Sequence, residues 1–265
     1  MKKIFFAALP TILFSGLLAV ADPTLAKNNK GIDMPEVDGV YDVAGRPDLK
    51  VRVIIHKAKP SPAPDPAAVC VADGASEAVV SAAGWKLPAS WTYSLNAASV
   101  PFSVGGANLP EIAANAFAAW SANTQNVSIV PVAPAAVSRA TFDGKNIIAW
   151  GTAPSSALAI TYIWYNTATG IVSELDTIMN KKYVWKWADQ DVLPSCGAGR
   201  ISAFAGAYDA QSILTHELGH WYGLNDHYTS DFANNTMYGY GFKGDAKYDT
   251  LTNGDIAGLK AIYGN

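Results

Sequence analysis

Apolar and polar residues recur along this 265-residue chain with two different periods, which mark helices and strands. A period of about 3.6 residues predicts helices at 109–120, 210–222 and 251–264. A period of two, or a short run rich in β-branched and aromatic residues, predicts strands. The expected strands cover residues 51–55, 91–95, 127–132, 160–165 and 171–179. This mixture predicts an α+β fold with a twisted mixed, mostly parallel sheet.

The first 21 residues have the pattern of a secretory signal peptide. Two lysines follow the initial methionine, an apolar run ends at Val20, and residues 19–21 form a small-x-small cleavage signature. Cleavage is expected after Ala21, which predicts a secreted or periplasmic protein. A membrane anchor is the alternative, but the run is short and contains Pro10.

Composition predicts a soluble globular protein. Half of the residues are hydrophobic, 15% are charged, and the formal net charge is −3, so no surface for nucleic acid or for anionic membranes is indicated. We expect a monomer with two parts after the signal peptide. Residues 22–82 would be a propeptide or a small ribbon with a proline-rich linker at 60–66. Residues 83–265 would be the main domain, and His56 is expected to be exposed.

Three of the four histidines lie within twelve residues, and residues 216–220 have the spacing H-E-x-x-H. On a helix, positions i and i+4 share a face, so His216 and His220 would aim both imidazoles at one point. Two imidazoles in this geometry are typical zinc ligands. The carboxylate of Glu217 would lie beside the attacking water as the general base.

A third ligand is expected just after this helix. Asp209 is expected as the N-cap, and Gly223 fits the position past the helix end, where φ is positive. In the extended pattern H-E-x-x-H-x-x-G-x-x-H the last ligand stands ten positions after the first, which here is Asp226. A carboxylate is a sound zinc ligand. His227 is the alternative ligand, one position out of register, and the residue that does not bind would neighbour the site.

Residues 216–226 resemble the metzincin zinc peptidases, with aspartate in place of the usual final histidine. Met237 resembles the methionine of the turn that this family places beneath the metal. The Met237-Tyr238 pair, the C-terminal stretch 251–264 and the strand–helix–strand order of 91–132 resemble the matrixin branch. The resemblance covers the main domain. It implies a metzincin/matrixin-like catalytic domain with three helices and the active-site helix at a cleft.

The resemblance also implies residues that hold substrate. The stretch 142–151 resembles the edge strand that pairs with an extended substrate, so the backbones of Ile148 and Ala149 would align the substrate. Tyr238 and Tyr240 would lie near the pocket for the residue that follows the scissile bond. Protein or peptide substrates are therefore the expected partners.

The chain also departs from the family pattern. Many matrixins carry a second, structural zinc, but Trp150 stands where one of its histidines would fall, so a single zinc ion is expected. Calcium is possible by resemblance, although residues 180–183 lack the expected acidic cluster. Of two adjacent acids at the start of the last helix, only Asp255 is present, with Gly254 at the first position. By resemblance, Asp255 would brace the backbone of the methionine turn.

Cys70 and Cys196 are the two cysteines of the chain. In an exported protein they are expected to form a disulfide, which would tie the upstream segment to the loop before the zinc helix. Alternatively, Cys70 could cap the zinc in a latent precursor. The family uses a Pro-Arg-Cys-Gly pattern for that purpose, which residues 68–73 do not match.

The sequence therefore predicts a secreted zinc endopeptidase. Zinc would be held by His216, His220 and Asp226, with Glu217 as the general base. A zinc-binding adhesion module without turnover is one alternative, but a purely structural site does not need Glu217. A zinc amidase that acts on cell-wall peptides is another, because the motif indicates amide hydrolysis more clearly than it indicates the polymer attacked.

Overall fold

The computed structural model describes residues 34–59, 69–72, 75–188, 199–202 and 206–264. These belong to one compact unit, Met34–Asn265, so the described part of the N-terminal segment is built into the same unit as the main domain. The predicted signal peptide and proline-rich linker lie outside the described residues. Within the described chain, no helix has the length and apolar character needed to cross a membrane.

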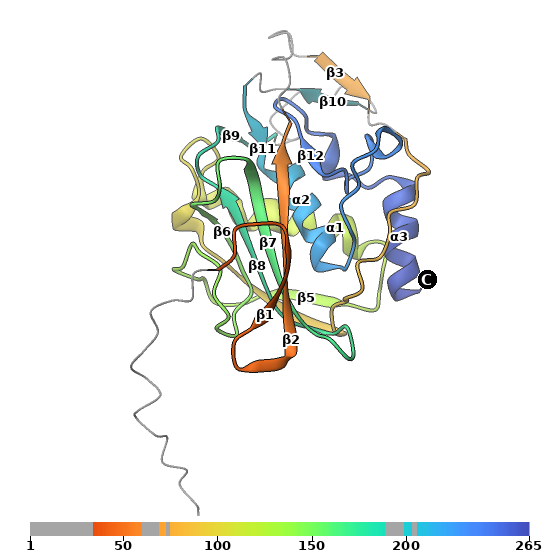
Figure 1. The fold of residues 1–265 in the computed structure, drawn as a ribbon. Coiled ribbons are helices and arrows are strands. Elements are labelled where there is room, and N and C mark those ends of the chain that lie inside the picture. Colours follow the sequence, from red (N-terminus) through yellow and green to blue (C-terminus); the bar gives the residue numbers. More distant parts are fainter. Residues whose placement is uncertain (1–33, 60–68, 73–74, 189–198, 203–205, 265) are drawn as a thin grey trace, which may run out of the picture. The chain divides into compact units, whose positions relative to one another are not determined.

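The described chain contains a mixed eight-stranded sheet, two two-stranded sheets and three α-helices (Figure 1), as expected for a fold of mixed α and β structure. The α-helices are α1 (Leu109–Ser121), α2 (Ala210–Trp221) and α3 (Asn253–Tyr263). The strands are β1 (Gly39–Val43), β2 (Arg46–Ala58), β3 (Val69–Ala72), β4 (Ser90–Leu95), β5 (Ser128–Pro131), β6 (Ile147–Gly151), β7 (Ala157–Asn166), β8 (Val172–Asn180), β9 (Trp185–Lys186), β10 (Gly199–Ser202), β11 (Tyr208–Asp209) and β12 (Tyr240–Gly241). The two-stranded sheets pair β3 with β10 and β9 with β11.

The main sheet has the strand order β1-β2-β7-β8-β6-β4-β5, and β12 pairs with β2 outside this path. The pairings among β8, β6, β4 and β5 are parallel. Those among β1, β2, β7 and β8 are antiparallel, and β12 runs parallel to β2. The sheet is therefore mixed, with most of its parallel pairing in one half. The N-terminal hairpin β1–β2 extends the antiparallel half.

The prediction that residues 142–151 form an edge strand is wrong. β6 lies between β4 and β8, and Ile148 pairs with Leu95 on one side and Thr177 on the other. Both Ile148 and Ala149 are fully buried, so neither backbone is available to align a substrate. The uninterrupted apolar run in β6 is typical of a strand that is covered on both faces.

Strand β2 faces two different apolar clusters with alternate residues. Ile54 belongs to the cluster that also contains Leu158 of β7 and Trp221 of α2. Val53 and Ile55 belong to the cluster on the other face of the sheet. Because side chains alternate along a strand, the residue two positions after Ile54 faces α2 as well. That residue is His56.

Helix α2 is buried along its whole length. It begins as predicted, because the Asp209 carboxylate accepts a hydrogen bond from the Ser212 amide at 2.7 Å. It ends at Trp221, and Gly223, two residues later, has a φ of +94°. A side chain at Gly223 would meet the carbonyl oxygen of Trp85 only 2.2 Å from its Cβ, so both conformation and space require glycine. The chain then turns back beside the helix.

Two buried carboxylates of β8 fasten the loop before β6. Glu174 accepts hydrogen bonds from the backbone amides of Asp143 and Gly144, at 2.8 and 2.6 Å. Asp176 accepts from the amides of Thr141 and Ile147, at 2.9 and 3.1 Å. Burial raises the pKa of Glu174 to about 7, although these amides oppose the shift. Burial likewise raises the pKa of Asp176 well above its ordinary value.

The raised pKa of Glu174 predicts a pH-dependent stability. The carboxyl binds its proton more tightly in the folded chain than in the unfolded chain, where its pKa is near 4.5. Its favourable contribution is complete below that pH and is lost as the pH rises to about 7. We expect the contribution of Glu174 to the free energy of unfolding to fall by about 1–3 kcal/mol as the pH rises from 5 to 8.

Urea unfolding at a series of pH values would measure this effect. The difference in unfolding free energy between wild type and Glu174→Gln should change across that range. The exposed control Glu111→Gln should differ from wild type by a constant amount. A wild-type minus Glu174→Gln difference that is flat in pH would contradict the assignment.

Candidate metal centre

The structure brings His216, His220 and Asp226 together at the end of α2, with one atom from each within 4.8 Å of the others. His216 Nε2 lies 3.0 Å from Asp226 Oδ1, and His220 Nε2 lies 3.3 Å from the same oxygen. All three atoms are buried, and within the described part of the chain none has a hydrogen-bond partner. Buried polar atoms without partners are costly and call for an explanation.

The other ring nitrogen of each histidine explains why the Nε2 atoms are unpartnered. His216 Nδ1 lies 2.7 Å from the carbonyl oxygen of Thr236, and His220 Nδ1 lies 2.9 Å from that of Leu224. A carbonyl only accepts, so each Nδ1 carries the proton and donates it. In the neutral tautomer each Nε2 then presents a lone pair toward Asp226. Three electron-rich atoms that face one another require a cation between them.

The separations of these atoms suit a metal ion. With metal–ligand bonds of about 2.0–2.1 Å, neighbouring ligand atoms of a tetrahedral site lie roughly 3.3 Å apart. The observed 3.0 and 3.3 Å are close to this spacing. A proton on a histidine is the other cation that could fill the role. Burial opposes protonation of His216, but the nearby Asp226 carboxylate raises the pKa of that ring. The two histidines in turn hold the pKa of Asp226 well below its ordinary value despite burial.

Met237 lies directly against α2 between the two histidines. A Cβ added at Gly219 would be 2.2 Å from Met237 Sδ and 2.7 Å from a ring carbon of Trp120. Met237 is fully buried, and its carbonyl accepts a hydrogen bond from the His227 amide at 3.0 Å. The turn at Met237 therefore packs beneath the cluster, and only glycine at 219 leaves room for it.

Asp255 binds the same turn from α3. Its carboxylate accepts hydrogen bonds from the amides of Thr236 and Met237, at 2.9 and 3.2 Å. This contact is the brace that the sequence resemblance implied. Position 254 holds glycine, where the family pattern has an acid, for a local steric reason. A Cβ there would lie 2.0 Å from the carbonyl oxygen of Ala78. The chain that precedes the main domain thus crosses the start of α3 at this point.

His227 does not join the cluster. Its Nε2 accepts a hydrogen bond from the Ser81 amide at 3.0 Å, and its ring stacks on Phe232 with centroids 3.9 Å apart. Asp226 faces the cluster with Oδ1 and accepts a hydrogen bond from the Tyr228 hydroxyl with Oδ2, at 2.8 Å. The geometry therefore favours Asp226 over His227 as the third ligand. Tyr228 was not anticipated from the sequence.

The prediction that His56 is exposed is wrong. It is 1% exposed and lies on β2 against the cluster. Its ring stacks on that of His216 with centroids 3.7 Å apart, and its Nδ1 lies 3.2 Å from Glu217 Oε1. Burial and the neighbouring His216 lower the pKa of His56 to about 4, so the ring is neutral near pH 7. It can then donate its Nδ1 proton to Glu217.

Glu217 is fully buried and both of its oxygens are engaged. Oε1 faces His56, and Oε2 accepts a hydrogen bond from the Thr161 hydroxyl on β7 at 2.6 Å. Burial would raise the pKa of Glu217, but the hydrogen bond from His56 and the charges of the histidines lower it. Glu217 is therefore an ionised carboxylate beside the candidate metal ligands, which is the chemical state a general base requires.

Tyr238 and Tyr240 lie downstream of Met237, on the side of the cluster where β12 meets β2. Their rings are in edge contact, with centroids 5.6 Å apart, and Tyr228 contacts Tyr240 at 5.1 Å. Lys59, which follows β2, places its ammonium group 5.3 Å from the ring centre of Tyr240. The two tyrosines therefore form a wall that is covered by the end of β2.

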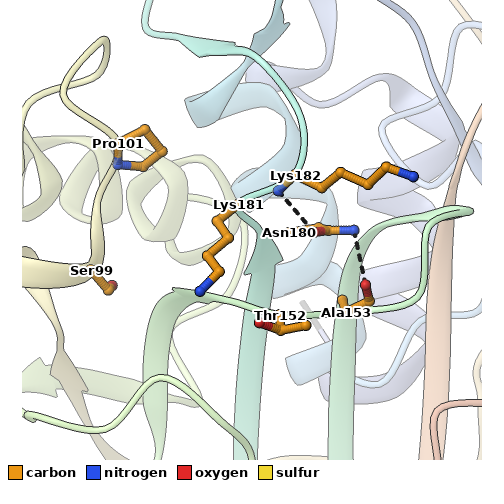
Figure 2. Close-up of a pocket in the computed structure, with 7 residues that line it drawn as sticks. All are labelled: Ser99, Pro101, Thr152, Ala153, Asn180, Lys181 and Lys182. Atoms are coloured by element: carbon orange, nitrogen blue, oxygen red, sulfur yellow. Dashed lines mark hydrogen bonds between the residues drawn. The ribbon is translucent and has the colours of Figure 1, made fainter.

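A surface pocket of about 520 Å³ lies elsewhere, at the ends of β6 and β8 (Figure 2). It is lined by Ser99, Pro101, Thr152, Ala153, Asn180, Lys181 and Lys182. The most buried polar groups of this pocket already form hydrogen bonds within the fold. The Asn180 amide donates to the carbonyls of Pro154 and Ala157, and the Ser99 hydroxyl accepts from the Trp150 amide. The pocket shares no residue with the cluster.

Cys196 lies outside the described residues, so the disulfide stays a prediction. The backbone of Cys70 lies in β3 opposite Ile201 of β10.

The structure thus gathers His216, Glu217, His220 and Asp226, and it adds a histidine from the N-terminal segment. Compared with family models and with curated proteins, the chain has no match.

Proposed function

We propose that this chain is a secreted zinc-dependent endopeptidase of the metzincin type. The observation that carries the proposal is the convergence of three buried, unpartnered atoms from His216, His220 and Asp226 beside the carboxylate of Glu217. Two imidazoles and one carboxylate form a donor set that suits zinc and leaves room for a fourth ligand. Met237, packed beneath the cluster, supports the metzincin assignment.

The residues around the cluster would divide the work of peptide hydrolysis. Zinc bound there would polarise the scissile carbonyl and make water more acidic. Glu217 would accept a proton from the attacking water and then deliver it to the leaving amine as the C–N bond breaks. Thr161 would hold the Glu217 carboxylate in place through its 2.6 Å hydrogen bond. The carbonyls of Thr236 and Leu224 would fix the tautomer of the two histidines.

A metal-binding module without turnover is the second candidate. It is favoured by one observation: both oxygens of Glu217 are engaged, and the carboxylate is fully buried. A carboxylate held in this way by His56 and Thr161 could act only as a structural partner of the metal site.

Hydrolysis assays separate the two candidates. The secreted protein, loaded with zinc, would be offered casein, a peptide library and peptidoglycan fragments, before and after treatment with a chelator. Peptide cleavage that stops on chelation and returns with zinc would support the endopeptidase. Cleavage of peptidoglycan fragments alone would identify an amidase instead. If the zinc-loaded protein cleaves none of these three substrates even after its N-terminal segment has been removed, the binding module is favoured.

The identity of the third ligand gives a separate prediction. Asp226→Ala should reduce bound zinc from about one ion per chain to nearly none after dialysis, because two neutral imidazoles alone hold zinc weakly. His227→Ala should retain the ion, since His227 contacts Ser81 and Phe232 rather than the cluster. Elemental mass spectrometry would measure the zinc content. Retention in Asp226→Ala with loss in His227→Ala would reverse the assignment.

A further inference from the structure

We propose that strand β2 occupies the substrate channel of this chain, so that the enzyme is latent until β2 is displaced. The inference rests on the proposed hydrolytic function and names its regulation. His216, Glu217 and His220 are each no more than 1% exposed. A peptide bond must reach Glu217 to be hydrolysed, and the group that lies there is His56 of β2.

The backbone of β2 is held on both sides, as an extended peptide would be. Residues Leu49–Lys57 pair antiparallel with β7, which carries Thr161. Lys57 and Ala58 pair in parallel with β12, and the amides of Lys57 and Lys59 donate to the carbonyls of Gly239 and Gly241, at 3.4 and 3.0 Å. Figure 1 shows β2 running between its neighbours past α2.

Removal of β2 would leave two strand edges facing each other. Neighbouring strands lie about 4.8 Å apart, so β7 and β12 would be separated by a gap of about 9–10 Å, the width of one strand. Unpaired edges of this kind bind extended peptides through main-chain hydrogen bonds. The gap leads directly over Glu217 and His216, because residue 56 of the present occupant touches both.

Side chains add to the fit of β2 in this channel. A Cβ at Gly241 would lie 2.5 Å from Leu158 and 2.9 Å from Ile213, so glycine lets β12 pack closely against the core beside β2. Farther along, the ammonium groups of Lys57 and Lys59 lie over aromatic rings, at 4.7 Å from that of Tyr228 and 5.3 Å from that of Tyr240. The end of β2 thus covers the wall formed by the tyrosines.

A tethered occupant excludes substrates efficiently. Its effective concentration is on the order of millimolar, so a peptide at micromolar concentration would reach the channel only rarely. Release of β2 should therefore increase hydrolysis on the order of 100-fold or more. The Glu217 carboxylate would at the same time lose its contact with His56 and face the incoming peptide.

The test uses the full zinc-loaded chain with the recognition sequence of a site-specific protease in place of residues 61–66. The chain would be compared uncut, and cut with the N-terminal fragment removed. Circular dichroism would follow folding, and casein cleavage would follow activity. A fluorescein-labelled peptide with the sequence of residues 46–59 would report access to the channel by its anisotropy. The same peptide with His56→Ala is the matched control.

We expect the uncut chain to bind no labelled peptide and the released chain to stay folded and bind it, more tightly than the His56→Ala peptide. Casein cleavage should rise on release and fall when the peptide is added back. Equal cleavage by the uncut chain, unfolding on release, or a folded released chain that ignores the peptide would each overturn the proposal. Peptide binding only after release, without any hydrolysis, would support the occupancy and refute the proposed enzymatic function.

Discussion

Replacement of Glu217 by glutamine should lower the rate of peptide hydrolysis by about 100-fold to 10,000-fold while zinc stays bound. Glutamine preserves the volume of the side chain and can still accept the hydrogen bond from Thr161, so the fold around α2 should survive. It cannot accept a proton from water at neutral pH. The loss should therefore appear in kcat for the active form of the chain, with little change in zinc content.

Two comparisons make this prediction specific. Glu111→Gln changes an exposed glutamate on α1, and it should leave both hydrolysis and zinc content at wild-type levels. Thr161→Val removes the hydroxyl that holds Glu217, and it should reduce the rate by less than Glu217→Gln does. If Glu217→Gln hydrolyses peptides as fast as wild type with zinc in place, Glu217 is not the general base.

Much of the candidate site follows from local spacing. His216 and His220 meet because positions i and i+4 share a helix face, and this holds for any helix. The position of Asp226 follows from the helix end, since Gly223 reverses the chain and returns it to His216 and His220 within three residues. These relations span few residues, so they could be predicted from the sequence without knowledge of the rest of the fold.

The contribution of β2 could not be predicted in this way. His56 reaches Glu217 across 161 positions of sequence, and that contact depends on which strand β2 pairs with. The alternation in β2 places His56 on the same face as Ile54, but it does not say which face meets α2. A buried neutral histidine and an exposed one have the same local sequence signal.

The wrong prediction of an edge strand at residues 142–151 has a different physical cause. Residues 147–150 are all apolar, and a strand at an exposed edge usually carries polar residues on one face. The run therefore indicates an interior strand, in contrast to the edge strand that the resemblance implies. The strand that lies beside Glu217 is instead β7, through Thr161, and β7 is covered by β2.

Replacement of Asp255 by alanine should destabilise the folded chain by about 3–5 kcal/mol and weaken zinc binding. The fully buried carboxylate accepts hydrogen bonds from the amides of Thr236, Met237 and Thr252, at 2.9, 3.2 and 3.0 Å, so alanine leaves three buried donors without a partner. The Thr236 carbonyl in turn binds His216 Nδ1 at 2.7 Å. Release of this turn would therefore free the ring of His216, a proposed metal ligand.

Urea unfolding with and without a chelator, together with zinc titration, would measure both parts of this prediction. Asp231→Ala, at an exposed position, is the matched control and should change the unfolding free energy by no more than about 0.5 kcal/mol. The chelated protein should still show most of the Asp255→Ala loss, because the three amides are unsatisfied whether or not zinc is bound. A loss that appears only with zinc present would mean that Asp255 acts on the metal site alone. A loss below about 1 kcal/mol in both conditions would mean that the turn at Met237 is held by its packing against Gly219 and Trp120 rather than by the carboxylate.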